Sequence, residues 1–179
     1  MPTTLTKIAV AAICFCLSSS IQAGRAYGAD FIAAAGKGAY GLSLNYPGAG
    51  IKYYLSDNFA LELKGQADAD VKVGGLRLYD HFFTSDRLYL FWGLEADYID
   101  YKGTASRGAG GAGELFCGFE YFISPAVSLQ ADFGPAYIYL KDRHDPVTVN
   151  GIEYVTNFAF TVYFGGLKSG EGNWLLSLI

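Results

Sequence analysis

The sequence of 179 residues lacks long apolar runs. Beyond the first 23 residues there is no stretch of about 18 apolar residues, whereas a helix needs about 20 to cross the hydrocarbon core of a bilayer. We therefore do not expect a protein built from membrane-spanning helices.

Basic charge is also scarce, with 13 Lys and Arg residues against 17 Asp and Glu and a net charge of −4 at pH 7. Loss of Lys7 with an N-terminal signal would change the net charge to −5. A surface that binds nucleic acid needs a stripe of Lys and Arg to neutralise phosphates. We therefore expect no nucleic acid as a partner.

Cysteine is rare, with three residues. Cys14 and Cys16 lie in the apolar part of the N-terminal signal, so Cys117 stands alone in the mature chain and no intramolecular disulfide is expected. Cys117 is either a reactive thiol or a small apolar residue that faces lipid. Its place in an alternating segment favours the second interpretation.

Histidine is limited to His81 and His144. A deacylase of barrel type would need a His and a Ser close together, oriented by an acid. His81 is near Ser85 in the sequence, but we expect both to lie at the periplasmic end of the barrel, in the wrong leaflet for such an enzyme. A metal site could be formed by Asp142, His144 and Asp145, but these residues are typical of a solvated loop. We expect no enzymatic activity, no cofactor and no bound metal.

Glycine and aromatic residues are abundant instead, with 23 Gly, 14 Tyr and 13 Phe, as is typical of a β-protein with many turns. The clearest pattern runs from Ile152 to Phe164, where the even positions are mostly aromatic or apolar and the odd positions are mixed and smaller. Successive side chains of a strand point to opposite faces, so one face of this strand is apolar. Its length and its aromatic residues near both ends indicate a membrane-spanning strand that closes a barrel.

The N-terminus has the three parts of a secretory signal peptide. Lys7 provides positive charge, residues 8–17 form an apolar core, and residues 18–23 form a polar exit that ends in Ala23. We expect residues 1–23 to be a signal peptide, with cleavage after Ala26 or Ala29 as alternatives. Residues 24–38 are expected to be a lead-in.

Seven further segments alternate in a similar way. They predict an all-β fold, an eight-stranded antiparallel up-and-down transmembrane β-barrel over residues 39–166. A phase slip at Gly74 and Gly75 predicts a bulge or kink there, and Pro135 needs a bulge or a strand end. Residues 103–113 and 142–151 are expected to be long outer loops. The eight expected strands are Ala39–Tyr46, Gly50–Leu55, Phe59–Asp68, Val71–Phe83, Leu88–Tyr101, Glu114–Ile123, Ser128–Leu140 and Ile152–Phe164.

The signal peptide, the alternating strands and turns such as YLSDNFALEL and YFISPAVSLQADFG resemble the small bacterial outer-membrane β-barrel superfamily, with its OmpA-type and OmpX-type members. The resemblance covers residues 30–165 and implies a location in the outer membrane of a Gram-negative bacterium, with membrane lipid and the barrel-assembly machinery as partners. Such chains usually end on the aromatic residue of the last strand. Residues 167–179 depart from this pattern and are interpreted as a C-terminal tail.

The expected inward faces carry many charged residues. A narrow barrel is filled by its side chains and isolated buried charge is costly, so these groups must pair or bind water. We predict an interior polar network that fills and stiffens the barrel. The alternative is a narrow path that favours cations, since acids are in excess. The expected members are Lys52, Glu62, Lys64, Arg77, Glu95, Asp97, Glu114, Glu120, Asp132 and Glu153.

These observations predict a monomeric outer-membrane barrel with a structural or surface-interaction role, in envelope integrity or in adhesion to a surface ligand through its outer loops. One alternative is a narrow channel or a conduit for small molecules, of porin-like type. The other is a secreted soluble binder of lipocalin type, which would have an apolar interior and a polar exterior.

Overall fold

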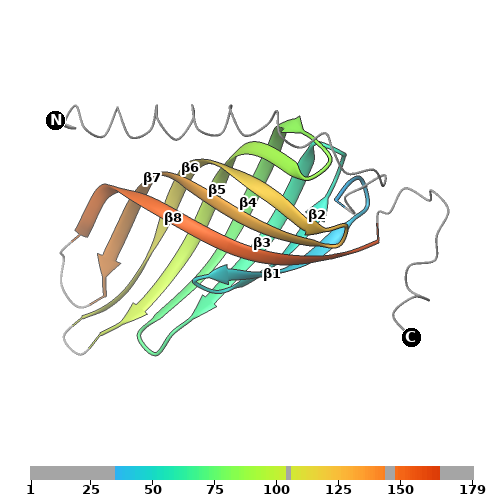
Figure 1. Ribbon diagram of the computed structural model, residues 1–179. Helices are drawn as coiled ribbons and strands as arrows, with labels where there is room; N and C mark the ends of the chain where they lie inside the picture. Colours follow the sequence, from blue (N-terminus) through green and yellow to red (C-terminus); the bar gives the residue numbers. More distant parts are fainter. Residues whose placement is uncertain (1–34, 104–105, 144–147, 166–179) are drawn as a thin grey trace. The chain divides into compact units, whose positions relative to one another are not determined.

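The computed structural model describes residues 35–103, 106–143 and 148–165, which form eight antiparallel strands in a closed ring (Figure 1). The predicted eight-stranded barrel is confirmed. The expected signal peptide, the expected tail at 167–179 and most of the expected lead-in lie outside the described residues. Within the described ranges, no helix is long and apolar enough to cross a membrane. The strands are β1 (Tyr40–Tyr46), β2 (Ala49–Tyr54), β3 (Phe59–Ala67), β4 (Val71–Thr84), β5 (Leu88–Lys102), β6 (Arg107–Ser124), β7 (Val127–Asp142) and β8 (Thr148–Phe164).

The last strand closes the ring on the first, as its pattern predicted. β1 pairs with β8 from Tyr40 opposite Phe164 to Tyr46 opposite Phe158. The rings of Tyr40 and Phe164 stack with their centroids 5.7 Å apart, at the end of the seam. Aromatic cross-strand pairs of this kind stabilise a β-ladder.

The strands are staggered around the ring. A path that starts at Leu44 and follows paired residues through β2 to β7 reaches β8 at Asn150. Leu44 itself pairs with Phe160, ten residues further along β8. Such a stagger requires the strands to tilt, typically by about 35–45°, and an eight-stranded ring leaves an interior just wide enough for side chains.

The barrel wall has unequal height. β1 and β2 have 7 and 6 residues, whereas β6 and β8 have 18 and 17. β1 pairs only with the part of β8 that begins at Phe158, so no described strand pairs with the same side of Thr148–Asn157. We call this segment the free β8 edge. Figure 1 shows β5 to β8 extending well beyond the short β1–β2 hairpin.

The long outer loop expected at residues 103–113 is wrong, because β6 already begins at Arg107 and most of this stretch is strand. The loop expected at residues 142–151 is shorter than predicted, because β7 ends at Asp142 and β8 begins at Thr148. The glycines that indicated a loop fit a strand for a steric reason. A Cβ atom at Gly108 or Gly110 would collide with a carbonyl oxygen of β7, from Lys141 or Tyr139.

The bulge expected at Gly74 and Gly75 is also absent, because both residues keep a continuous register with β3 and β5. Val71 and Val73, which seemed out of phase, simply face inward beyond the polar interior. The register of β4 shifts instead between His81 and Phe83. Pro135 lies within β7 and causes neither a bulge nor a strand end.

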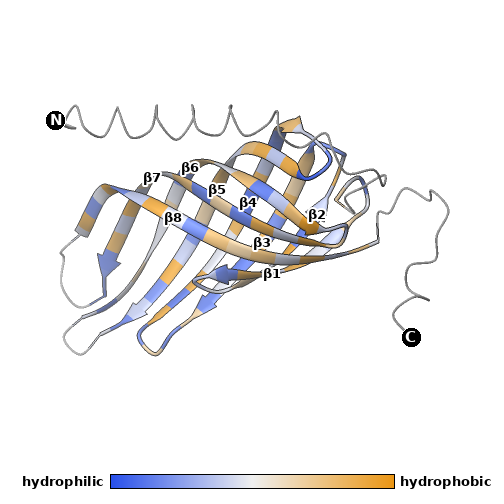
Figure 2. Cartoon of the chain, in the orientation of Figure 1, coloured by the Kyte–Doolittle hydropathy of each residue, from blue (hydrophilic) through white to orange (hydrophobic). Residues whose placement is uncertain are grey.

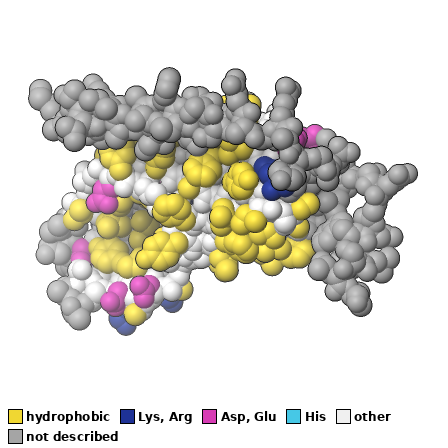
Figure 3. All heavy atoms as spheres, in the orientation of Figure 1, with side chains coloured by type: hydrophobic (Ala, Val, Ile, Leu, Met, Phe, Trp, Pro, Cys, Tyr) yellow, Lys and Arg dark blue, Asp and Glu magenta, His cyan; other side chains and the backbone are white. Residues whose placement is uncertain are grey.

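The two faces of the wall have opposite character, and hydropathy alternates along the strands (Figure 2). Outward side chains are exposed and apolar, including Leu63, Leu94 and Phe158 at 62%, 48% and 57% exposure. Figure 3 shows a broad apolar surface on the visible wall. Inward side chains are buried, and many of them are polar or charged.

Gly93 tests how tightly the interior is packed. A Cβ atom there would collide with the carbonyl oxygen of Leu78 and the ring of Phe116, whereas a Cβ at Gly74 meets nothing within 4 Å. We expect Gly93→Ala to lower the free energy of unfolding by about 1–3 kcal/mol. The matched change Gly74→Ala should be neutral or should stabilise by up to about 1 kcal/mol. Urea unfolding followed by tryptophan fluorescence measures both, and equal effects would contradict the packing described above.

Candidate functional site

Nine of the ten charged residues predicted for the interior lie inside the barrel. Lys64 and Asp97 are half-buried, and the seven others are buried, with Lys52, Arg77 and Glu120 at 0% exposure. They come from β2 to β7 and occupy the inward positions that alternation assigned to them. The buried seven are Lys52, Glu62, Arg77, Glu95, Glu114, Glu120 and Asp132.

The interior position predicted for Glu153 is wrong, because its side chain is exposed and joins no ion pair described in the structure. It has the inward phase and lies opposite Ala136. However, it belongs to the free β8 edge, where the short β1 no longer closes the wall. Its side chain is therefore exposed.

Glu120 is the centre of the cluster at the end of the barrel where β1 begins and β8 ends. Its carboxylate accepts hydrogen bonds from Ser128 Oγ and Tyr163 OH, both at 2.5 Å, and from Tyr54 OH at 3.3 Å. Lys52 Nζ forms an ion pair with it at 3.4 Å. A fully buried carboxylate is thus surrounded by donors, which offsets the cost of removing it from water.

Glu62 of β3 is satisfied in the same manner, by side chains of β1 and β4. Ser43 Oγ and Asn45 Nδ2 donate to its Oε1 at 2.6 and 2.8 Å, and Tyr79 OH donates to Oε2 at 2.5 Å. The side chain of Gln130 connects Lys52, the partner of Glu120, with Asp132. It accepts from Lys52 Nζ at 2.6 Å and donates to Asp132 Oδ2 at 2.9 Å.

Arg77 binds the carboxylates of two further strands. Its Nε lies 2.9 Å from Glu95 Oε2 and its NH2 group donates to Asp132 Oδ1 at 2.7 Å. The guanidinium lies 4.1 Å from the centroid of the Phe116 ring, a cation–π contact. Lys64 also forms an ion pair with Glu95. One arginine thereby joins β4, β5 and β7 across the interior.

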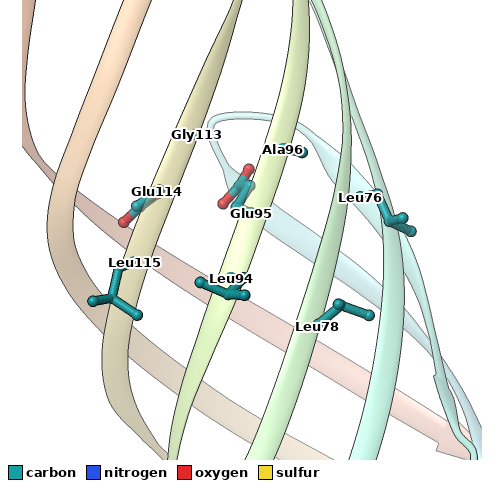
Figure 4. A pocket seen from close by; sticks show the side chains of 8 residues that line it. All are labelled: Leu76, Leu78, Leu94, Glu95, Ala96, Gly113, Glu114 and Leu115. Carbon is teal, nitrogen blue, oxygen red and sulfur yellow. The ribbon is translucent and has the colours of Figure 1, made fainter.

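Two carboxylates next to Arg77 remain outside these pairs. Asp97 Oδ1 and Glu114 Oε1 are buried and accept no hydrogen bond from the described residues. Glu114 lies opposite Glu95 in the ladder between β5 and β6, and Asp97 lies opposite Gly75. Figure 4 shows Glu95 and Glu114 side by side on these strands, beside a hollow in the wall lined by Leu94 and Leu115.

His81 was not assigned to the interior from the sequence, yet it is 1% exposed. Its Nε2 lies 3.3 Å from Tyr54 OH, and its ring stacks on that of Tyr54. Ser85 Oγ instead contacts the backbone of Leu88, within its own turn. No cluster of metal-binding side chains occurs in the described ranges.

Several neutral partners of the charged residues were also missed, although their inward phase was visible in the sequence. Alternation puts tyrosine, serine and amide side chains on the same faces as the charges, and that signal was sufficient to include them. Together with buried Phe91, Phe116 and Phe122 they fill the lumen. The missed partners are Ser43, Asn45, Tyr54, Tyr79, Ser128, Gln130, Asn157 and Tyr163.

A closed ring of eight antiparallel strands with a polar, filled interior and an apolar outer face defines the class of this fold. No family model and no curated protein matches the sequence. The structure is similar to the crystal structure of the N-terminal β-barrel domain of Pseudomonas aeruginosa OprF, an OmpA-type outer-membrane barrel. The TM-score is 0.52 and the identity is 15%, over 72% of this chain and 99% of that chain. The resemblance to OmpA-type barrels is thus confirmed at the level of the fold.

Proposed function

We propose that this protein is a bacterial outer-membrane β-barrel with a structural and surface-interaction role. The observation that carries the proposal is the polarity of the wall. Large apolar side chains are exposed on every strand from β1 to β8, whereas charged side chains are buried inside. A soluble binder of lipocalin type requires the reverse arrangement. In a bilayer the apolar face would be covered by lipid, which is the first proposed partner.

The filled interior supports a structural role over transport. Tyr54, Tyr79, Phe91 and Tyr163 have 0% exposure, and Arg77 lies across the middle of the lumen between two carboxylates. Eight-stranded barrels are generally filled in this way, whereas aqueous channels need more strands. No cofactor or catalytic group is part of this proposal.

The projecting part of the sheet supports a surface-interaction role. The described connections at the end where β1 meets β2 are short, so strands rather than long loops extend furthest there. The free β8 edge offers unpaired backbone N–H and C=O groups, which are able to pair with a strand of another chain. We propose that this end faces outward and carries any adhesive function.

A labelling experiment along β8 tests the location. In a Cys117→Ala background, single cysteines replace Phe158, Ala159, Phe160 and Thr161 in protein inserted into liposomes. We expect a lipid-soluble maleimide to react at 158 and 160, which face outward, and not at 159 and 161, which are buried. Uniform reactivity, or a protein that is recovered from the bacterial envelope without detergent, would contradict the membrane location.

The same background tests the orientation. Cysteine in place of Asn150, near the start of β8, should react with a membrane-impermeant maleimide added to intact cells. Labelling of this position only after cell lysis would place the projecting sheet in the periplasm and remove the basis for a surface role.

A further inference from the structure

Part of the inner face of the tall wall, on β4, β5 and β7, is apolar beyond the polar interior. The side chains that follow the charged layer on β4, β5 and β7 are Val73, Ile99, Ile138 and Leu140. All four are half-buried rather than buried. We call them the apolar bowl.

The register places the apolar bowl next to the carboxylates of Asp97 and Glu114. Asp97 pairs with Ala112, which pairs with Ile138, in one row of the sheet. In the next row outward, Val73 lies opposite Ile99. Apolar side chains therefore lie in the rows next to the acidic side chains.

The floor of the apolar bowl has more acid than base. Glu95, Asp97, Glu114 and Asp132 face only Lys64 and Arg77, and both cations are engaged by Glu95 or Asp132. Glu114 is 6% exposed, and its Oε1 accepts no hydrogen bond from the described residues. A buried carboxylate oxygen without a donor is costly, so a cationic donor beside Glu114 would be favourable.

The apolar bowl is accessible from one side. β1 ends at Tyr46, β2 begins at Ala49, and the pairing of β8 with β1 stops at Phe158. The described wall consequently closes around the polar interior but not around the apolar bowl.

We propose that the apolar bowl binds an amphiphilic organic cation, an ammonium group with an alkyl chain. The ammonium group donates hydrogen bonds to Asp97 and Glu114, while the chain lies against Ile99 and Ile138. An anion would be repelled by the floor, and a neutral alkyl compound would not offset its excess of acid. A divalent metal lacks its ligands, because no group of three metal-binding side chains lies in the described ranges.

Calorimetric titration of the folded protein in an uncharged maltoside detergent tests this proposal. The probes are hexylammonium, methylammonium and hexanol. We expect saturable binding of hexylammonium, with at least about tenfold weaker binding of the other two. Methylammonium lacks the alkyl chain, and hexanol lacks the positive charge. Equal binding of hexanol and hexylammonium, or no saturable binding, would overturn the proposal.

Variants identify the site. Glu114→Gln and Asp97→Asn should each weaken hexylammonium about tenfold or more, whereas Asp86→Asn, an acid-to-amide change in the exposed turn between β4 and β5, should leave it unchanged. Ile138→Ser should weaken hexylammonium but not methylammonium. Heat-modifiable gel migration confirms that each variant is folded. If the double variant of Glu114 and Asp97 binds as well as the parent protein, the assigned site is wrong.

Discussion

Arg77→Met is expected to destabilise the barrel by about 3–5 kcal/mol. The methionine would fill much of the space and keep the contact with Phe116, but Glu95 and Asp132 would each lose their arginine. Glu95 would keep only Lys64. Removing one partner of a buried ion pair is costly because it leaves the other charge buried without compensation. The measurement is the free energy of unfolding in urea, in detergent or liposomes.

Arg143→Met provides the matched control for this prediction. Arg143 also forms an ion pair, with Asp100 at 3.4 Å, but the two side chains are 51% and 36% exposed. Exposed pairs contribute about 0–1 kcal/mol, so this variant should unfold almost like the parent protein. Similar costs for the two variants would show that burial of the Arg77 pairs does not determine their contribution.

Leu94→Arg is expected to destabilise the barrel in a bilayer by about 2–4 kcal/mol, the cost of placing arginine on the lipid face near the midplane. Leu94 is 48% exposed, faces outward and lies near the middle of β5. A soluble protein would tolerate this change and would become more soluble. Refolding into liposomes at increasing urea concentration measures the difference.

Asn150→Arg is the control for position along the wall. Asn150 has the same outward phase but lies near the projecting end of β8, where we propose that the wall leaves the membrane. Its replacement should cost at most about 1 kcal/mol. An equal penalty at both positions would contradict the proposed depth, and no penalty at Leu94 would contradict the membrane location itself.

The corrections to the sequence interpretation share one cause, which is that local patterns do not reveal what lies on the neighbouring strand. Gly108 and Gly110 resemble loop glycines until the carbonyl oxygens of β7 are seen to occupy the space of their side chains. Glu153 has the inward phase, but only the early end of β1 shows that nothing covers it. Val73 seemed out of phase because an apolar residue was not expected inside a polar lumen.

The sequence by itself determined the number of strands, their antiparallel order and, at most strand positions, which side chain faces inward. These properties follow from a period of two, because adjacent side chains of a strand always point to opposite faces. It thereby determined that Lys52, Arg77 and Glu120 share the interior.

The tertiary structure alone decided which of these groups meet. Lys52 and Glu120 are 68 residues apart and lie on β2 and β6, so their contact across the lumen depends on the stagger accumulated around the whole ring. The same stagger, combined with the unequal lengths of β1 and β8, separates the satisfied polar interior from the apolar bowl. A period of two assigns each side chain to the inner or the outer face. Only closure of the barrel decides its position along the barrel axis and the side chains that it contacts.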